Sequence, residues 1–212
     1  MIARPAMLAV TLLTLAGCAR DGEIDATGGV AITRTSCPAV AVPANTGDIT
    51  LFDPPASRDA RAIDVVATIT NVRSTCDDQG TDIVSSATFD VIARRSNASG
   101  ARDVIIPYFA TVVQGGNAVV AKRIANVRLS FADGQTRATG SGAGGATIDR
   151  AVATLPADIR EQLTKRRKAG DAEAATDPLA IPEVRAAVAR ASFELLVGFQ
   201  LTADQLQYNA TR

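Results

Sequence analysis

Three cysteines are the most reactive side chains in this chain of 212 residues, and no histidine accompanies them. Without imidazole, Ser-His-Asp and Cys-His hydrolases and histidine-ligated zinc or copper sites are excluded. Catalysis would then need a Ser-Lys pair or paired carboxylates, and no lysine has a serine at the helical Ser-x-x-Lys spacing. The adjacent Asp77 and Asp78 are typical of a turn. We expect a protein that is not an enzyme and has no metal and no cofactor, with a histidine-free hydrolase as an alternative.

Cys18 follows a short N-terminal segment that is typical of an export signal. Residues 1–17 contain one positive charge, Arg4, then an apolar run over residues 7–15 and two small residues. Spanning a bilayer takes about 20 apolar residues, so this run is too short for a retained transmembrane helix. Residues 15–18, Leu-Ala-Gly-Cys, resemble the bacterial lipobox, which implies that lipid is attached to Cys18 and that the peptide is cut before it. The alternative is an ordinary secretory signal that contains a cysteine.

This resemblance divides the chain into three parts. We expect residues 1–17 to be the signal peptide and residues 18–36 to be the lipidated N-terminus and a flexible tether. Residues 37–212 are expected to form a β-sandwich domain, because apolar and polar residues alternate along them. The residue after Cys18 is Ala19, which by the same resemblance implies the outer membrane, with the protein facing the periplasm. Lysine plus arginine (22) balance aspartate plus glutamate (22), so no global charge favours nucleic acid. We expect the membrane, through the lipid anchor, and an envelope protein or cell-wall component as partners.

Cys37 and Cys76 remain after the lipidated cysteine, and an even number of cysteines in an exported chain indicates a disulfide. Closing a loop of this length stabilises a fold by about 4 kcal/mol in the chain-entropy model. The alternative is a metal or redox pair. It is disfavoured because the chain has neither a Cys-x-x-Cys spacing nor a histidine to complete a site.

The body of the chain alternates apolar and polar residues with a period of two, which is typical of half-buried strands. Turn residues such as Gly, Asn and Asp separate the runs, so consecutive strands are expected to be antiparallel neighbours. We predict a mainly β protein with an antiparallel immunoglobulin-like β-sandwich. Pro107 has no N–H to donate, so it predicts an edge position or a bulge. The predicted strands cover residues 63–70, 87–94, 104–113, 119–124 and 127–131.

The last third of the chain changes character. The glycine-rich residues 140–145 predict a flexible loop, and Pro156 and Pro182 each predict the start of a short helix. Residues 192–200 alternate again and predict a last core strand, so one or two helices are inserted before it. Thr202 and Gln205 have the spacing of a capping box, which predicts a terminal turn of helix.

Three segments are candidate sites. Gly140, Gly142 and Gly145 satisfy the dinucleotide motif G-x-G-x-x-G, but the βαβ setting that it needs is missing. Pro107, Tyr108 and Phe109 are a possible partner-binding edge, and core packing beside a bulge is the simpler interpretation. A basic run is a possible contact for anionic ligands such as lipopolysaccharide, and a solvated helix end is the simpler interpretation. This run consists of Lys165, Arg166, Arg167 and Lys168.

Several of these features together resemble a family of small uncharacterised proteobacterial lipoproteins. The shared features are the lipobox, the Ser-Cys-Pro-Ala-Val start at residues 36–40, Cys76, Pro107-Tyr108-Phe109 and the ending over residues 197–209. The resemblance implies an exported, lipid-anchored β-domain with no assigned activity, so no catalytic residue is carried over. We expect a module that binds or braces another envelope component. A cell-wall or lipopolysaccharide-binding module that uses the basic run is the alternative.

Overall fold

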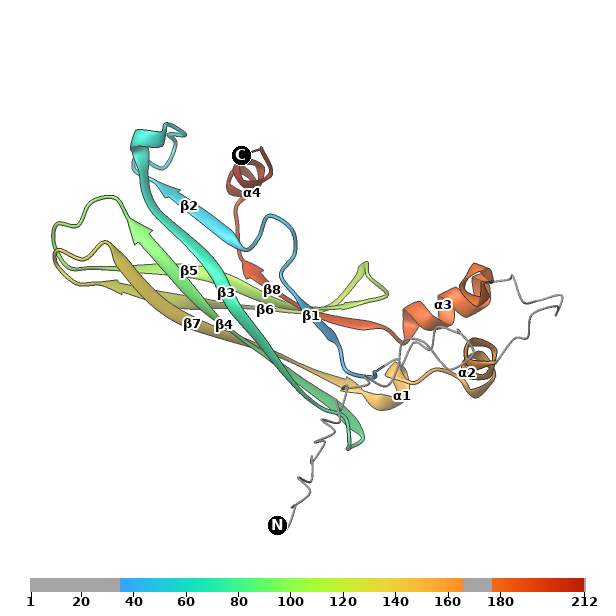
Figure 1. Ribbon diagram of the computed structural model, residues 1–212. Coiled ribbons are helices and arrows are strands. Elements are labelled where there is room, and N and C mark those ends of the chain that lie inside the picture. The colour runs from blue at the N-terminus through green and yellow to red at the C-terminus, as the bar shows by residue number, and fades with distance from the viewer. Residues whose placement is uncertain (1–34, 166–176, 212) are drawn as a thin grey trace, which may run out of the picture. The chain divides into compact units, whose positions relative to one another are not determined.

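Eight strands form two sheets in the computed structural model, which describes residues 35–165 and 177–211 (Figure 1). The strands are β1 (Ala39–Ala41), β2 (Asp48–Phe52), β3 (Ile63–Asp77), β4 (Asp82–Arg95), β5 (Arg102–Gln114), β6 (Ala118–Phe131), β7 (Arg137–Asp149) and β8 (Phe193–Phe199). The helices are α1 (Arg150–Ala153), α2 (Ala157–Thr164), α3 (Pro182–Arg190) and α4 (Ala203–Thr211), with 3-10 turns η1 (Ala60–Ala62) and η2 (Pro178–Ala180).

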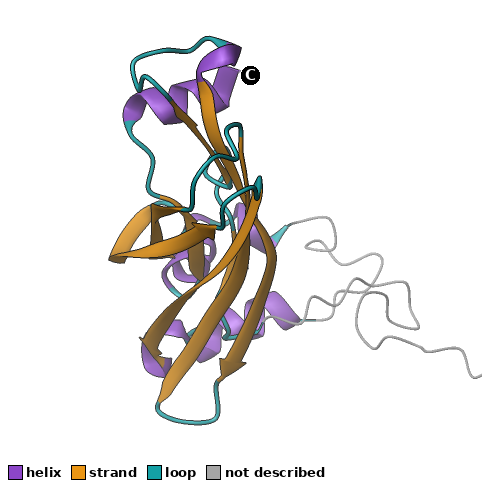
Figure 2. Ribbon diagram, turned by 90° about the vertical axis from the view of Figure 1, so that its left-hand side faces the viewer, coloured by secondary structure: helices purple, strands orange, loops and turns teal. Residues whose placement is uncertain are grey.

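The order of strands is β1-β8-β5-β6 in one sheet and β2-β3-β4-β7 in the other. Every pairing is antiparallel except that of β1 with β8, which is parallel. The described part of the chain is therefore mainly β, with two mostly antiparallel sheets, as the alternation predicted. Helices lie at both ends of the strands, with α4 at one end and α1, α2 and α3 at the other (Figures 1 and 2).

One hydrophobic core joins the two sheets. Along β4 the buried side chains alternate with outward ones, because successive side chains of a strand point to opposite faces. Phe89 of β4 meets Tyr108 of β5 edge to face, with ring centroids 5.1 Å apart. Such a contact across the sheets fixes their spacing as well as burying area. The largest wholly buried apolar side chains are Phe89, Phe131, Phe199, Ile83, Ile106, Leu129 and Leu195.

The glycine-rich segment is strand β7 and not a flexible loop, so that prediction was wrong. Gly140, Gly142 and Gly144 alternate with outward residues and face the core. A Cβ on Gly142 would stand 2.4 Å from the ring of Phe89, and one on Gly144 would stand 2.4 Å from the Cβ of Ala110. Glycine is needed because neighbouring side chains already fill these places.

Three of the helices, α2, α3 and α4, begin where the sequence predicted them, whereas α1 was not predicted. α2 follows Pro156, α3 begins at Pro182, and Ile159 and Val184 are among the residues of a small second core. At α4 the N–H of Thr202 donates to Gln205 Oε1 at 2.9 Å, and the N–H of Gln205 donates to Thr202 Oγ1 at 3.3 Å. The expected capping box and the expected last strand, β8, are both confirmed.

Candidate functional site: the open edge of strand β6

Four strands lie at the edges of the two sheets: β1 and β6 in one, β2 and β7 in the other. The outer side of an edge strand carries N–H and C=O groups with no ladder partner, so it can accept a strand from another chain. Proteins usually cover or shorten such edges. Whether each edge is covered, short or exposed therefore shows where this domain can bind an extended segment.

The edge of β7 is covered by the opposite sheet. Tyr108 of β5 donates its hydroxyl hydrogen to the carbonyl oxygen of Ala143 at 2.8 Å, and the N–H of Ala143 donates back to the same hydroxyl at 3.2 Å. Both outer backbone groups of Ala143 are thereby satisfied. Further along, β7 lies against β6, because a Cβ on Gly140 would stand 2.6 Å from Val127 and 2.8 Å from the carbonyl oxygen of Arg128.

The edge of β2 is covered by the C-terminal helix. Asn209 of α4 donates through Nδ2 to the carbonyl oxygens of Asn45 at 2.9 Å and Asp48 at 2.7 Å. The rings of Phe52 and Tyr208 meet edge to face at 5.2 Å, which seats the helix on the strand. In the other sheet, the edge strand β1 is only three residues long, so it has few backbone groups to offer a partner.

The first nine residues of β6, Ala118 to Asn126, form the open edge. All nine are exposed, on both faces of the strand, whereas Val127, Leu129 and Phe131 further along are buried. Three of the nine are large aliphatic residues with most or half of their surface in solvent: Val119 (63% exposed), Val120 (52%) and Ile124 (60%). Exposed aliphatic side chains on a strand with free backbone groups are typical of a pairing surface.

The direction of the free backbone groups follows from the register. The N–H of Gln200 donates to the carbonyl oxygen of Pro107 at 2.9 Å, so the backbone of Pro107 points toward β8. Asn126 lies opposite Pro107 in β6. In an antiparallel pair, the backbone N–H and C=O groups of two opposite residues either all point toward the partner strand or all point away from it. The N–H and C=O groups of Lys122, Ile124 and Asn126 therefore point away from β5, into solvent.

The open edge is positively charged. Lys122 and Arg123 are adjacent, and no acidic residue lies between Ala118 and Asn126. The Nζ of Lys122 lies 5.3 Å from the centroid of the Phe109 ring, a cation-π contact that holds the ammonium group on the outer face of the sheet. Arg123 forms no ion pair with any described residue.

A buried arginine of β4 joins two loops at the far end of β6. Arg95, 2% exposed, donates to the carbonyl oxygens of four loop residues and lies over the ring of Phe131, the last residue of β6, at 5.2 Å. A guanidinium with all its hydrogen bonds made to carbonyl oxygens can remain buried without a carboxylate. It ties the β4–β5 loop to the β6–β7 loop. The acceptors are Ala98, Gly100, Ala132 and Gln135, at 2.6 to 2.9 Å.

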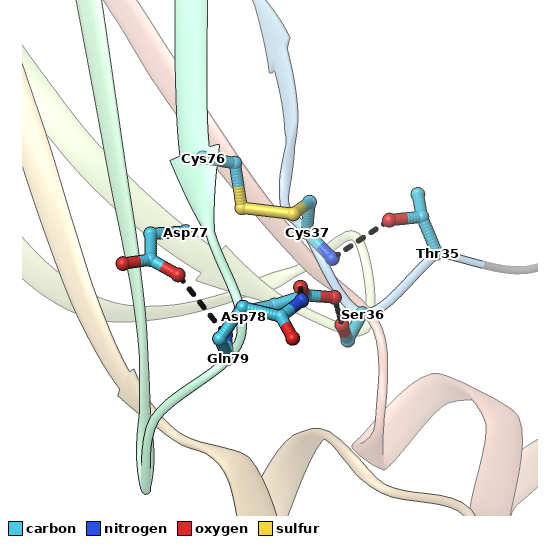
Figure 3. Close-up of a disulfide and its surroundings, with 7 residues drawn as sticks. All are labelled: Thr35, Ser36, Cys37, Cys76, Asp77, Asp78 and Gln79. Carbon is cyan, nitrogen blue, oxygen red and sulfur yellow. Dashed lines mark hydrogen bonds between the residues drawn. A yellow bond between two sulfur atoms is a disulfide. The ribbon is translucent and has the colours of Figure 1, made fainter.

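The disulfide predicted between Cys37 and Cys76 is confirmed (Figure 3). It joins the start of the described chain to β3, near the β3–β4 turn. Beside it the hydroxyl of Ser36 donates to Asp78 Oδ2 at 2.6 Å. This hydrogen bond stabilises the carboxylate and lowers the pKa of Asp78 below its ordinary value, although partial desolvation opposes the effect. The disulfide thus holds Cys37, near the start of the described residues, against the end of β3.

The partner-binding edge proposed at Pro107, Tyr108 and Phe109 is wrong. β5 is an inner strand between β8 and β6, and Tyr108 is 6% exposed. Pro107 is tolerated in an inner strand because it lies just beyond the last residue that β8 pairs with β5, where no ladder donor is needed. The edge lies one strand further on, in β6, whose exposed Val119, Val120 and Ile124 were the available signal.

The other predicted sites are only partly described. Lys165 follows α2 and is exposed, whereas Arg166, Arg167 and Lys168 lie outside the described residues, as does Cys18. Within the described ranges, none of the helices is both long and apolar enough to cross a membrane. Comparison of the chain with protein-family models, curated proteins and solved structures found no match.

Proposed function

We propose that this chain is a non-enzymatic, lipid-anchored envelope protein whose β-domain binds a partner protein through the open edge of β6. In this proposal the partner adds a strand beside β6, a mode known as β-augmentation, in which main-chain hydrogen bonds supply affinity and side-chain contacts supply specificity. The observation that carries it is the contrast among the four edges. β7 and β2 are covered by Tyr108 and Asn209, and β1 is very short, whereas nine residues of β6 are exposed on both faces.

The proposed location follows from the N-terminus. The lipobox-like residues 15–18 support lipidation at Cys18, and Ala19 supports the outer membrane, with the domain facing the periplasm. The Cys37–Cys76 disulfide supports an oxidising compartment, because such bonds persist mainly outside the cytosol. A domain held at a membrane meets its partners at high local concentration, so a short strand interface is sufficient for binding.

The finer immunoglobulin-like form remains a prediction. The parallel pairing of β1 with β8, the first and last strands, brings the ends of the domain into one sheet. Constant-type immunoglobulin domains place the first, second, fourth and fifth strands in one sheet. Here β2, β3 and β4 follow each other as neighbours in the same sheet, with β7 beside them. This strand order differs from that of a constant-type immunoglobulin domain.

Replacing Ile124 by proline tests the proposed edge. The N–H of Ile124 points into solvent, so proline removes one donor that an added strand would use and leaves the β5–β6 ladder intact. We expect full-length Ile124→Pro to fold, and to lose the crosslinked adduct that the wild-type protein forms in native envelopes. An unchanged adduct from the folded variant would overturn the proposal.

Ala125→Pro is the matched control for the fold. The N–H of Ala125 points toward Tyr108 of β5, so proline there breaks the ladder that holds β6 in its sheet. We expect this variant to be less stable than Ile124→Pro by about 1–3 kcal/mol, measured by chemical denaturation. Equal destabilisation by the two prolines would show that the backbone directions are wrongly assigned.

A further inference from the structure

We infer that the strand which pairs with β6 carries two adjacent acidic residues, one on each face of the sheet. This inference rests on the proposed function and adds the chemistry of the partner. It starts from the charges on the open edge, where Lys122 and Arg123 are consecutive and no carboxylate lies between Ala118 and Asn126.

The two cations point to opposite faces of the sheet. Lys122 lies opposite Thr111 and shares the outer face with Phe109, while Arg123 lies opposite Ala110 on the inner face. Directly opposite residues of paired strands have Cβ atoms about 4.5–5.5 Å apart, so each cation would meet one residue of an added strand. Opposite charges in such pairs stabilise the pairing and like charges destabilise it. An added strand with acids at two consecutive positions matches both faces at once.

The inner cation is available for such a pair. Ala110 and Ala125, the residues opposite Arg123 and next to it on the inner face, have small side chains, and β6 is exposed on its inner face up to Ala125. Other arginines at this sheet already have carboxylate partners: Arg128 contacts Asp103 at 2.7 Å, and Arg102 contacts Asp64 at 2.9 Å. Arg123 has none among the described residues.

Aliphatic positions flank the cations and define the rest of the partner. Ile124 lies on the outer face beside the Phe109 ring, since these two residues are direct register partners. A β-branched residue two positions from the outer-face acid would pack against Ile124. Val119 and Val120 are exposed aliphatic residues at the other end of the open edge, where a second β-branched residue of the partner could pack. The partner segment is therefore extended, β-branched on either side, and acidic at its centre.

A second copy of this chain is a poorer occupant than an acidic strand. Pairing two open edges would bring both Lys122–Arg123 pairs onto one short ladder that contains no acid. Lysine on an edge strand discourages pairing between identical edges. The same charges that reject a copy of β6 admit an acidic strand, which is how one edge combines protection with specificity.

The test uses the full-length chain in detergent micelles and two labelled peptides. Both are capped nine-residue segments of alternating Thr and Val, one with two adjacent Glu at its centre and the other with two adjacent Lys. We expect fluorescence anisotropy to show the Glu peptide binding at least about tenfold more tightly than the Lys peptide, since each charge pair changes sign between them. The double variant Lys122→Glu/Arg123→Glu should reverse this order. The matched control Arg94→Glu/Arg137→Glu changes two exposed cations on the other sheet and should leave the order unchanged.

Three outcomes would overturn the inference. They are equal binding of both peptides, no binding of the Glu peptide at millimolar concentration, and wild-type dimers in sedimentation that Ile124→Pro abolishes, which would assign the edge to a second copy. The proposed function fails separately. If Ile124→Pro removes the envelope adduct while Lys122→Glu/Arg123→Glu retains it, the edge binds a partner that is not acidic. If neither variant affects the adduct, the edge is not the binding surface.

Discussion

Tyr108 and Ala143 exchange two hydrogen bonds through a single hydroxyl group, at 2.8 Å and 3.2 Å. Tyr108 belongs to an inner strand of one sheet and Ala143 to an edge strand of the other. A side chain that sequence alternation places in the core thus satisfies the open backbone of the facing sheet. The pairing explains why β7 has no free edge at this point, and it makes the open edge of β6 an exception within the described part of the fold.

Removing this hydroxyl should expose its role. In Tyr108→Phe both outer backbone groups of Ala143 lose their partner, which we expect to cost about 1–3 kcal/mol in the free energy of unfolding. Hydrogen exchange at the amide of Ala143 should accelerate more than at its neighbours. Ser141→Ala, an exposed change on the same strand, is the control and should stay within about 0.5 kcal/mol of the wild type. Unaltered exchange at Ala143 would contradict the assignment.

Arg95 should be among the most sensitive positions for stability. Its replacement by alanine removes a wholly buried side chain and leaves four loop carbonyl oxygens without their donor, so we expect a loss of at least about 3 kcal/mol in chemical denaturation. Arg95→Lys should recover little of this, because one ammonium group cannot reach acceptors spread around a planar guanidinium. The neighbouring Arg94, which is exposed, gives the control: Arg94→Ala should change stability by no more than about 0.5 kcal/mol. Similar losses from the two alanine variants would refute this role.

The disulfide should contribute strongly to stability. The bonded cysteines are 39 residues apart in sequence, and closing such a loop is worth about 4 kcal/mol in the chain-entropy model. The double variant Cys37→Ala/Cys76→Ala should lose about 4 kcal/mol in the free energy of unfolding, and should therefore unfold at a lower denaturant concentration. A reducing agent should lower the stability of the wild-type protein and not that of the double variant. Equal sensitivity of both proteins to reduction would show that the bond is not the cause.

Ser36 should control the titration of Asp78. Because the hydrogen bond from Ser36 lowers the pKa of Asp78 below 3.8, the folded state favours the carboxylate. The resulting stabilisation is present well above pH 3.8 and is lost as the pH falls through the folded pKa. In Ser36→Ala the pKa of Asp78 should rise toward 3.8, measured by NMR titration of the side chain. Asp103, whose pKa is lowered by Ser130 and then Arg128, is an internal control and should not move. An unchanged titration of Asp78 would disprove the assignment.

Alternation with a period of two located most strands but not their place in the sheets. β6 was expected as two pieces, residues 119–124 and 127–131, because Ala125 and Asn126 between them carry no large apolar side chain. Whether a strand is inner or outer depends on residues far away in sequence. Pro107 lies in an inner strand only because residues 193–199 return to pair with β5.

Strand β7 was missed because its composition is typical of a loop. Glycine lowers strand propensity, and the local sequence does not show that Phe89 and Ala110 fill the places of the missing side chains. The alternation of Gly140, Gly142 and Gly144 with other small residues was the available signal. The disulfide and the capping box of α4 were predictable because each depends on a few residues of fixed chemistry.

Site-specific photocrosslinking in native envelopes tests the open edge most directly. A photoreactive amino acid replaces either Ile124 of the edge or Ile92, a similarly exposed isoleucine (60% against 51%) on the inner strand β4. We expect a discrete protein adduct from position 124 and none from position 92. Adducts from position 92 alone, or equally from both positions, would contradict it.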